Sequence, residues 1–123
     1  MDIVEALKSN ILVSIPLEEI VNVFCTVNEI FSFDNSEYIF DSGIYESTCD
    51  EMFNFSLIRE YKENNILNRI CVDVIFSPNI DNYELSDNRH FSSHNDFKNY
   101  VLATNEYKIL KNKNILKINI YQD

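Results

Sequence analysis

Two alternating runs of apolar residues, joined by a short polar segment, constrain the fold of this chain more than any other feature. The first run, FNFSLIREY, begins at Phe53, and the second, ICVDVIFSP, ends at Pro78. In each run the large apolar residues recur at every second position, which places them on one face of an extended strand. The reversal falls within residues 62–68, where Asn64 and Asn65 best tolerate positive φ. This stretch therefore predicts a β-hairpin.

Two helices are expected before the hairpin. Apolar residues at helical spacing predict a first helix from Asp2 to about Asn10. Ser14 as a capping residue, Pro16 in the first turn and the two acids that follow predict the start of a second helix. Its buried stripe would contain Leu17, Ile20, Val21, Phe24, Val27 and Phe31. A strand through residues 21–27 is the alternative, because Val, Phe and Thr favour strands, but the capping signals favour a helix.

The segment between the second helix and the hairpin is polar and aromatic. Residues 34–36, Asp-Asn-Ser, are typical of a turn, and Gly43 is the only glycine of the chain. A lone glycine commonly marks a turn or a bulge. We therefore expect two short strands here, over residues 37–40 and 44–47, with Gly43 between them.

After Pro78 the chain is rich in Asn, Asp and Ser, and we expect a loop with a short strand around residues 83–85. Ser93 precedes Asp96 by three residues, a spacing typical of a helix start, so a helix is predicted from about His94 to Thr104, with a continuation toward Lys111 as the alternative. The chain then closes with a half-exposed strand over residues 115–121, whose apolar side would hold Leu116, Ile118 and Ile120.

These elements predict one α+β domain spanning residues 1–123. Its largely antiparallel sheet would carry the N-terminal helices and one late helix packed on it. A chain of 123 residues, 46% of them hydrophobic, can bury roughly two thirds of its unfolded surface, so a packed core is expected.

Charge is distributed unevenly along the chain. Of 20 carboxylates and 10 lysines and arginines, residues 1–58 hold eleven carboxylates and one base, Lys8, whereas the remainder is balanced. An acidic surface repels phosphate backbones and anionic lipids and attracts cationic partners. We expect no direct contact with nucleic acid and no membrane association. The N-terminal MDIVEALK lacks the basic region of a signal peptide, so a cytoplasmic location is predicted.

The sequence offers little catalytic chemistry. One glycine is too few for a dinucleotide fingerprint, a P-loop or a nucleophile elbow. His90 and His94 are four residues apart and could hold a metal ion, but that spacing is useful on a helix, whereas residues 90–93 are expected in a loop. We therefore predict no enzymatic activity, no catalytic residue, no cofactor and no metal. A small metal-dependent enzyme using His90 and His94 is kept as an alternative.

The cysteines and Arg59 are interpreted as structural. Cys25, Cys49 and Cys71 are odd in number and widely spaced, which favours buried free thiols over a disulfide framework. Cys71 should lie on the second face of the sheet. Arg59 shares the parity of the apolar face of its strand, and a structural ion pair with Asp73 or with a carboxylate in the first half of the chain is expected.

The acidic segment from Asp34 to Glu51 is the candidate binding surface. It has no basic residue and interleaves acids with aromatic rings, which suits a docking face where carboxylates steer encounter and tyrosines act as anchors. The alternative is a solvated sheet edge whose charges discourage aggregation. The predicted partner-binding residues are Asp34, Glu37, Tyr38, Asp41, Tyr45, Glu46, Asp50 and Glu51.

Several features of the chain are shared with a known class of protein: its small size, its acidity, the runs FNFSLIREY and ICVDVIFSP, the segment DFKNYVL and the final strand. In these features the chain resembles the immunity proteins of bacterial toxin–immunity systems, particularly those of contact-dependent growth inhibition. The likeness covers about the last 70 residues. The resemblance implies a neutralising role, in which the protein occludes the active site or substrate surface of a cognate basic toxin, often a nuclease. An acidic nucleic-acid mimic that inhibits a DNA-binding protein is a further alternative.

Overall fold

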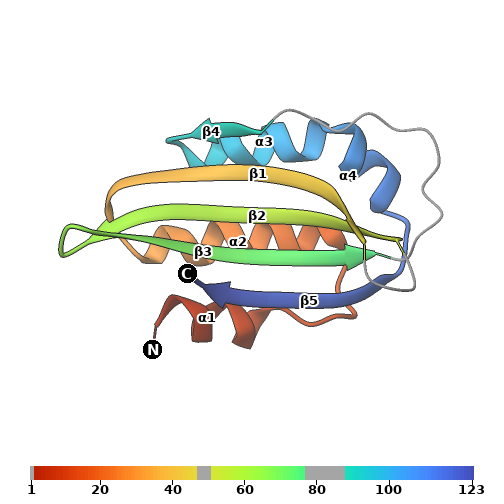
Figure 1. Cartoon of the computed structure of the whole chain (residues 1–123), viewed down its shortest axis with the longest axis horizontal. Coiled ribbons are helices and arrows are strands. Elements are labelled where there is room, and N and C mark those ends of the chain that lie inside the picture. Colours follow the sequence, from red (N-terminus) through yellow and green to blue (C-terminus); the bar gives the residue numbers. More distant parts are fainter. Residues whose placement is uncertain (1, 47–50, 77–87) are drawn as a thin grey trace.

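The computed structural model describes residues 2–46, 51–76 and 88–123, and these form an α+β domain (Figure 1). Asp2 caps the first helix, as expected, by accepting a hydrogen bond from the Glu5 amide at 2.8 Å. In chain order the elements are α1 (Ile3–Asn10), α2 (Leu17–Ile30), β1 (Asp34–Glu46), β2 (Glu51–Glu63), β3 (Ile66–Phe76), β4 (Arg89–Phe91), α3 (His94–Ala103), α4 (Asn105–Leu110) and β5 (Ile115–Gln122).

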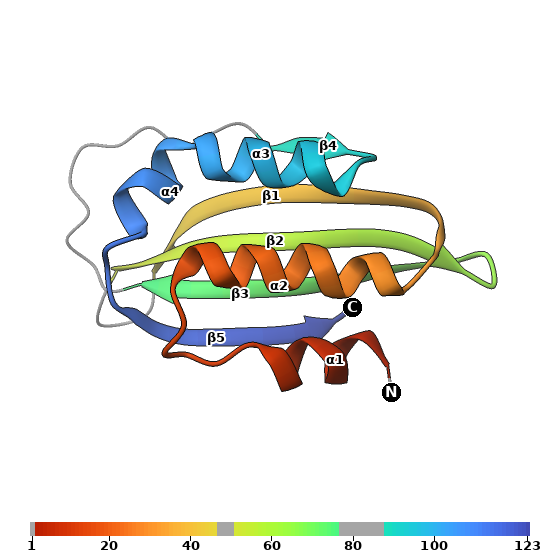
Figure 2. The ribbon, with the colours of Figure 1, turned by 180° about the vertical axis from the view of Figure 1, so that it is seen from behind.

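The strands form one antiparallel sheet in the order β4-β1-β2-β3-β5. All the described helices lie on one face of this sheet, as the front and back views show (Figures 1 and 2). We call the other face the open face, because no described helix covers it. Its side chains include Glu37, Ile39, Asp41, Ser56, Ile58, Glu60, Arg69, Cys71, Asp73, Asn119 and Tyr121. The predicted fold class is confirmed.

The core fills the space between the helices and the sheet. Leu17, Ile20, Val21, Phe24 and Val27 of the expected α2 stripe are buried and pack against the alternating apolar residues of β2 and β3. Phe31 is only partly buried and follows the end of α2 as its C-cap. The strand alternative for residues 21–27 is wrong, since they belong to α2. At the tip of the hairpin Asn64 and Asn65 take φ of 55° and 64°, which confirms both the hairpin and the residues that reverse it.

Gly43 does not end a strand. The structure has one continuous strand, β1, where two short ones were predicted, and Gly43 lies within it opposite Asn54. No atom lies within 4 Å of the position that a Cβ would occupy there, and its φ is not positive. Long-range pairing with β2 therefore overrides the local tendency of glycine to break a strand.

Several boundaries also differ from expectation. α2 begins at Leu17 with Pro16 as its N-cap, and no side chain caps it, so Ser14 lacks the capping role. Thr104 ends α3 and starts α4, so the late helix does not run on unbroken. The short strand β4 was not predicted, and the strand expected around residues 83–85 lies outside the described residues. A register shift beside Phe76 turns Leu116 outward, 54% exposed, while Ile118 and Ile120 pack on the core as predicted.

Candidate functional site: the open face of the sheet

Two carboxylates of the predicted acidic surface lie on the open face. Glu37 and Asp41 are both exposed on β1, on either side of the buried Ile39. The Glu37 carboxylate lies 2.7 Å from Nδ1 of His90 on the neighbouring strand β4. Asp41 accepts a hydrogen bond from the Ser42 amide at 2.9 Å, and no cation lies within ion-pair distance of it among the described residues.

Tyr38 faces the opposite way. Its side chain is only 5% exposed, and its ring lies edge-on to Phe24 and tilted against Phe97 in the core. The expected role of Tyr38 as an exposed anchor is therefore wrong. The reason is parity, because a residue next to Glu37 in a strand points to the other face. The same period of two places Tyr38 on the same face of β1 as the buried Phe40. This alternation is visible in the sequence and could have predicted that Tyr38 is buried.

The other predicted residues are described only in part. Asp34 pairs with Lys62 along the backbone, and Tyr45 and Glu46 pair with Met52 and Glu51. The side chains of these four predicted residues, and Asp50 as a whole, lie outside the described residues. Within the described residues, the candidate surface therefore contains Glu37 and Asp41.

The sequence did not indicate the carboxylate that faces Glu37. Glu60 of β2 lies directly opposite Glu37 on the open face, so two like charges are cross-strand neighbours. Such a pair destabilises a sheet. Each carboxylate contacts a different base on its outer side: His90 for Glu37, and Arg69 for Glu60 at 3.3 Å.

A second acidic position of the open face lies on β3. Asp73 accepts a hydrogen bond from the Ser56 hydroxyl at 2.8 Å and another from the Tyr121 hydroxyl. Burial raises the pKa of Tyr121, and the hydrogen bond to Asp73 raises it further. The neighbouring row contains Ile39, Ile58 and Cys71, which form a small buried cluster beneath the open face. The centre of the open face therefore combines a buried apolar cluster with a hydrogen-bonded carboxylate.

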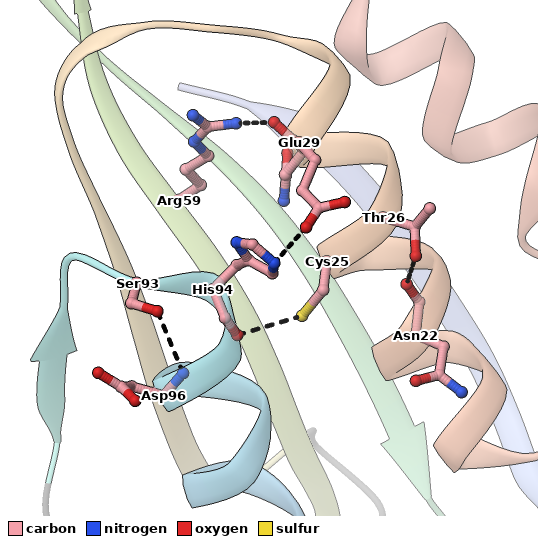
Figure 3. A network of polar contacts seen from close by, with 9 residues as sticks. Asn22, Cys25, Thr26, Glu29, Arg59, Ser93, His94 and Asp96 are labelled. Carbon is pink, nitrogen blue, oxygen red and sulfur yellow. Dashed lines mark hydrogen bonds and ion pairs between the residues drawn. The ribbon is translucent and has the colours of Figure 1, made fainter.

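A separate polar cluster joins α2 to the start of α3 on the helix-covered side (Figure 3). The Glu29 carboxylate contacts Nε2 of His94, and the Cys25 thiol donates to the backbone carbonyl of His94 over 4.0 Å. The cluster contains a thiol, an imidazole and a carboxylate, but the thiol does not face the ring. Burial also raises the pKa of Cys25 to about 12, which disfavours the nucleophilic thiolate. These contacts hold α2 against the start of α3, and their geometry does not suit nucleophilic catalysis by the thiol.

Arg59 forms hydrogen bonds with a helix end and a hydroxyl, where an ion pair with a carboxylate was expected. Its side chain lies on the core side of the sheet, away from Asp73, and donates to the backbone carbonyl of Asn28 and to the Ser36 hydroxyl. The guanidinium also lies over the rings of Phe33 and Tyr38, at 5.1 and 5.2 Å. The expected carboxylate partner is replaced by a helix end and two aromatic faces.

The two histidines do not converge. His90 contacts Glu37 on the open face, whereas His94 contacts Glu29 on the helix side. In the described part of the chain, no group of three or more His, Cys, Asp or Glu side chains is placed to hold a metal ion. This geometry lends no support to the alternative of a metal-dependent enzyme. Cys25 and Cys71 are buried free thiols, as predicted, and Cys49 lies outside the described residues.

Comparison with known protein families, with curated proteins and with solved structures gives no significant match for this chain. Among the helices of the described residues, none combines the length and the apolar character that crossing a bilayer requires.

Proposed function

We propose that this protein is a cytosolic immunity protein, which binds and neutralises a cognate basic toxin of the nuclease type through its open face. The supporting observation is the like-charged pair of Glu37 and Glu60, with Asp41 exposed beside it on the same strand. A cross-strand pair of carboxylates costs folding stability. A cationic partner would offset this cost on binding.

The chemistry of such a complex is electrostatic. Exposed carboxylates on one face steer a basic protein toward that face, and opposite charges raise association rates by roughly 10 to 1000-fold at low salt. Occlusion of the toxin would follow from docking alone and requires no reaction by the immunity protein. The nucleic-acid mimic has weaker support, because Arg69 and Lys117 lie among the carboxylates of the open face and interrupt a phosphate-like row.

The test is co-expression with the product of the neighbouring open reading frame, followed by measurement of association rates at about 50 and 300 mM salt. The double variant Glu37→Lys with Asp41→Lys should associate at least about tenfold more slowly and fail to protect cells. Glu19→Lys with Glu63→Lys changes the net charge equally but away from the open face, so it should protect normally. Equal loss in both double variants, or no complex with the wild-type protein, would contradict the proposal.

A further inference from the structure

A depression of about 480 Å³ lies on the open face between the start of β5 and the adjoining parts of β2 and β3. Its apolar wall comes from Met52, Ile75 and the exposed Leu116. Its polar wall comes from Asn54, Asp73, Lys117 and Asn119. A carboxylate, an ammonium group and two amides beside a strip of apolar surface form a site of mixed chemistry on the sheet.

Asp73 is the fixed point of this depression. The hydroxyls of Ser56 and Tyr121 both donate to its carboxylate and so hold the carboxylate in place. A carboxylate can accept about four hydrogen bonds, so acceptor capacity is left over. Among the residues described, no cation lies within ion-pair distance of Asp73. The depression therefore presents an oriented carboxylate that forms no ion pair among the described residues, although Lys117 lines the same depression.

We propose that the depression takes an arginine side chain of the partner protein. This inference rests on the proposed function and adds an anchor to it. The methylene stem would lie along Met52, Ile75 and Leu116, and the guanidinium would donate to Asp73 and to the side-chain oxygens of the two asparagines. Arginine suits this site better than lysine, because its planar fork donates to several acceptors at once and is more weakly hydrated.

Lys117 lines the same depression, so removing it tests whether the bound group is a cation or an anion. An ammonium group there opposes a bound cation and favours a bound anion. Removing Lys117 should therefore tighten the binding of a guanidinium, whereas neutralising Asp73 should weaken it. An anionic ligand would reverse both effects, so the two variants together determine the charge of the occupant.

The experiment titrates the isotope-labelled protein with N-acetyl-arginine amide and follows the side-chain amides of Asn54 and Asn119 by NMR. We expect saturable shifts with a dissociation constant on the order of 1 mM for so small a probe, and weaker binding of N-acetyl-lysine amide. Asp73→Asn should raise the dissociation constant at least about fivefold, and Lys117→Ala should lower it. Glu63→Gln, at the hairpin tip, is the matched control and should change nothing.

The outcomes separate this inference from the proposed function. If arginine amide leaves both asparagines unshifted at about 20 mM, or if Lys117→Ala weakens its binding, the inference is overturned, although the toxin complex can still form. If the probe binds but no toxin complex exists, the proposed function fails, and with it the assignment of the arginine to a partner. If the complex forms and Asp73→Asn weakens it alongside the probe, both stand.

Discussion

The guanidinium of Arg59, in the middle strand of the sheet, donates to the backbone carbonyl of Asn28 in the last turn of α2. A helix leaves its last carbonyls unpaired, and its C-terminus carries partial negative charge. The Asn28 carbonyl accepts from the Phe31 amide at 3.3 Å, and Arg59, which is only 4% exposed, gives it a second donor. Burial lowers the pKa of Arg59 below its ordinary value, because the charged form loses hydration. This contact fixes α2 to the sheet.

Replacing Arg59 should therefore destabilise the protein strongly. Arg59→Met keeps much of the stem but leaves the Asn28 carbonyl buried without this donor, which should lower the free energy of unfolding by about 2–4 kcal/mol. Arg59→Lys should cost about 1–2 kcal/mol, because a lysine cannot serve the Asn28 carbonyl and the Ser36 hydroxyl together. Urea unfolding followed by circular dichroism measures both values.

The control for Arg59 is Arg69, whose side chain is 45% exposed and pairs with Glu60 at 3.3 Å. Exposed ion pairs contribute about 1 kcal/mol or less, so Arg69→Met should have a small effect. Equal stability of Arg59→Met and Arg69→Met would show that the contact with α2 contributes nothing.

The hairpin turn provides a second prediction. Asn64 and Asn65 both have positive φ, the backbone conformation that a two-residue turn of this kind requires. Glycine takes it without strain, so Asn65→Gly should stabilise the protein by up to about 1 kcal/mol. Asn65→Val should destabilise it by about 1–2 kcal/mol, because a β-branched side chain clashes in this region. Thermal unfolding of the two variants checks the order, and a valine variant as stable as the wild type would contradict it.

The local elements could be predicted from the sequence because their signals are local. The period of two around the hairpin, the paired asparagines and the serine before α3 each act within a few residues. Gly43 and Leu116 were misinterpreted because strand pairing decides their environments. Gly43 is held in β1 by its register with Asn54, and Leu116 is turned outward where the register of β5 shifts.

The candidate site was predictable only in outline. Charge counting selected Glu37 and Asp41, which are exposed, but the cross-strand pair of Glu37 with Glu60 depends on a register that composition does not contain. The depression at Asp73 depends on β5 pairing with β3, which are separated along the chain by β4 and two helices. No local pattern specifies that neighbourhood.

Thr104 supplies a third prediction, since it separates α3 from α4. Its buried hydroxyl donates to the carbonyl of Val101 at 2.7 Å and accepts from the amide of Tyr107 at 3.2 Å. Thr104→Val keeps the shape without the hydroxyl and should cost about 1–2 kcal/mol of folding free energy. Thr104→Ser keeps the cap and should cost less than about 1 kcal/mol. Urea unfolding separates them, and equal costs would mean that the hydroxyl does not matter.

The buried thiols provide a fourth prediction, on reactivity and pH. Burial raises the pKa of Cys25 to about 12 and that of Cys71 to about 11, from the ordinary 9.0. At pH 8 the thiolate fraction should fall roughly 1000-fold for Cys25 and roughly 100-fold for Cys71, and Ellman's reagent should react correspondingly slowly with the folded protein. Stopped-flow measurements on a Cys49→Ser background isolate these two thiols, and the unfolded protein gives the reference rates.

The same shifts fix the sign of the effect of pH on stability. Above pH 9.0 the unfolded chain loses its thiol protons, while folded Cys25 and Cys71 keep theirs up to about 12 and 11. The unfolded state then binds fewer protons, so stability is full below pH 9.0 and declines as pH rises toward 11. In a variant with Cys25→Ala, Cys71→Ala and Cys49→Ser this decline should be smaller. An unchanged decline would assign it to other groups, such as Tyr121, whose pKa burial also raises.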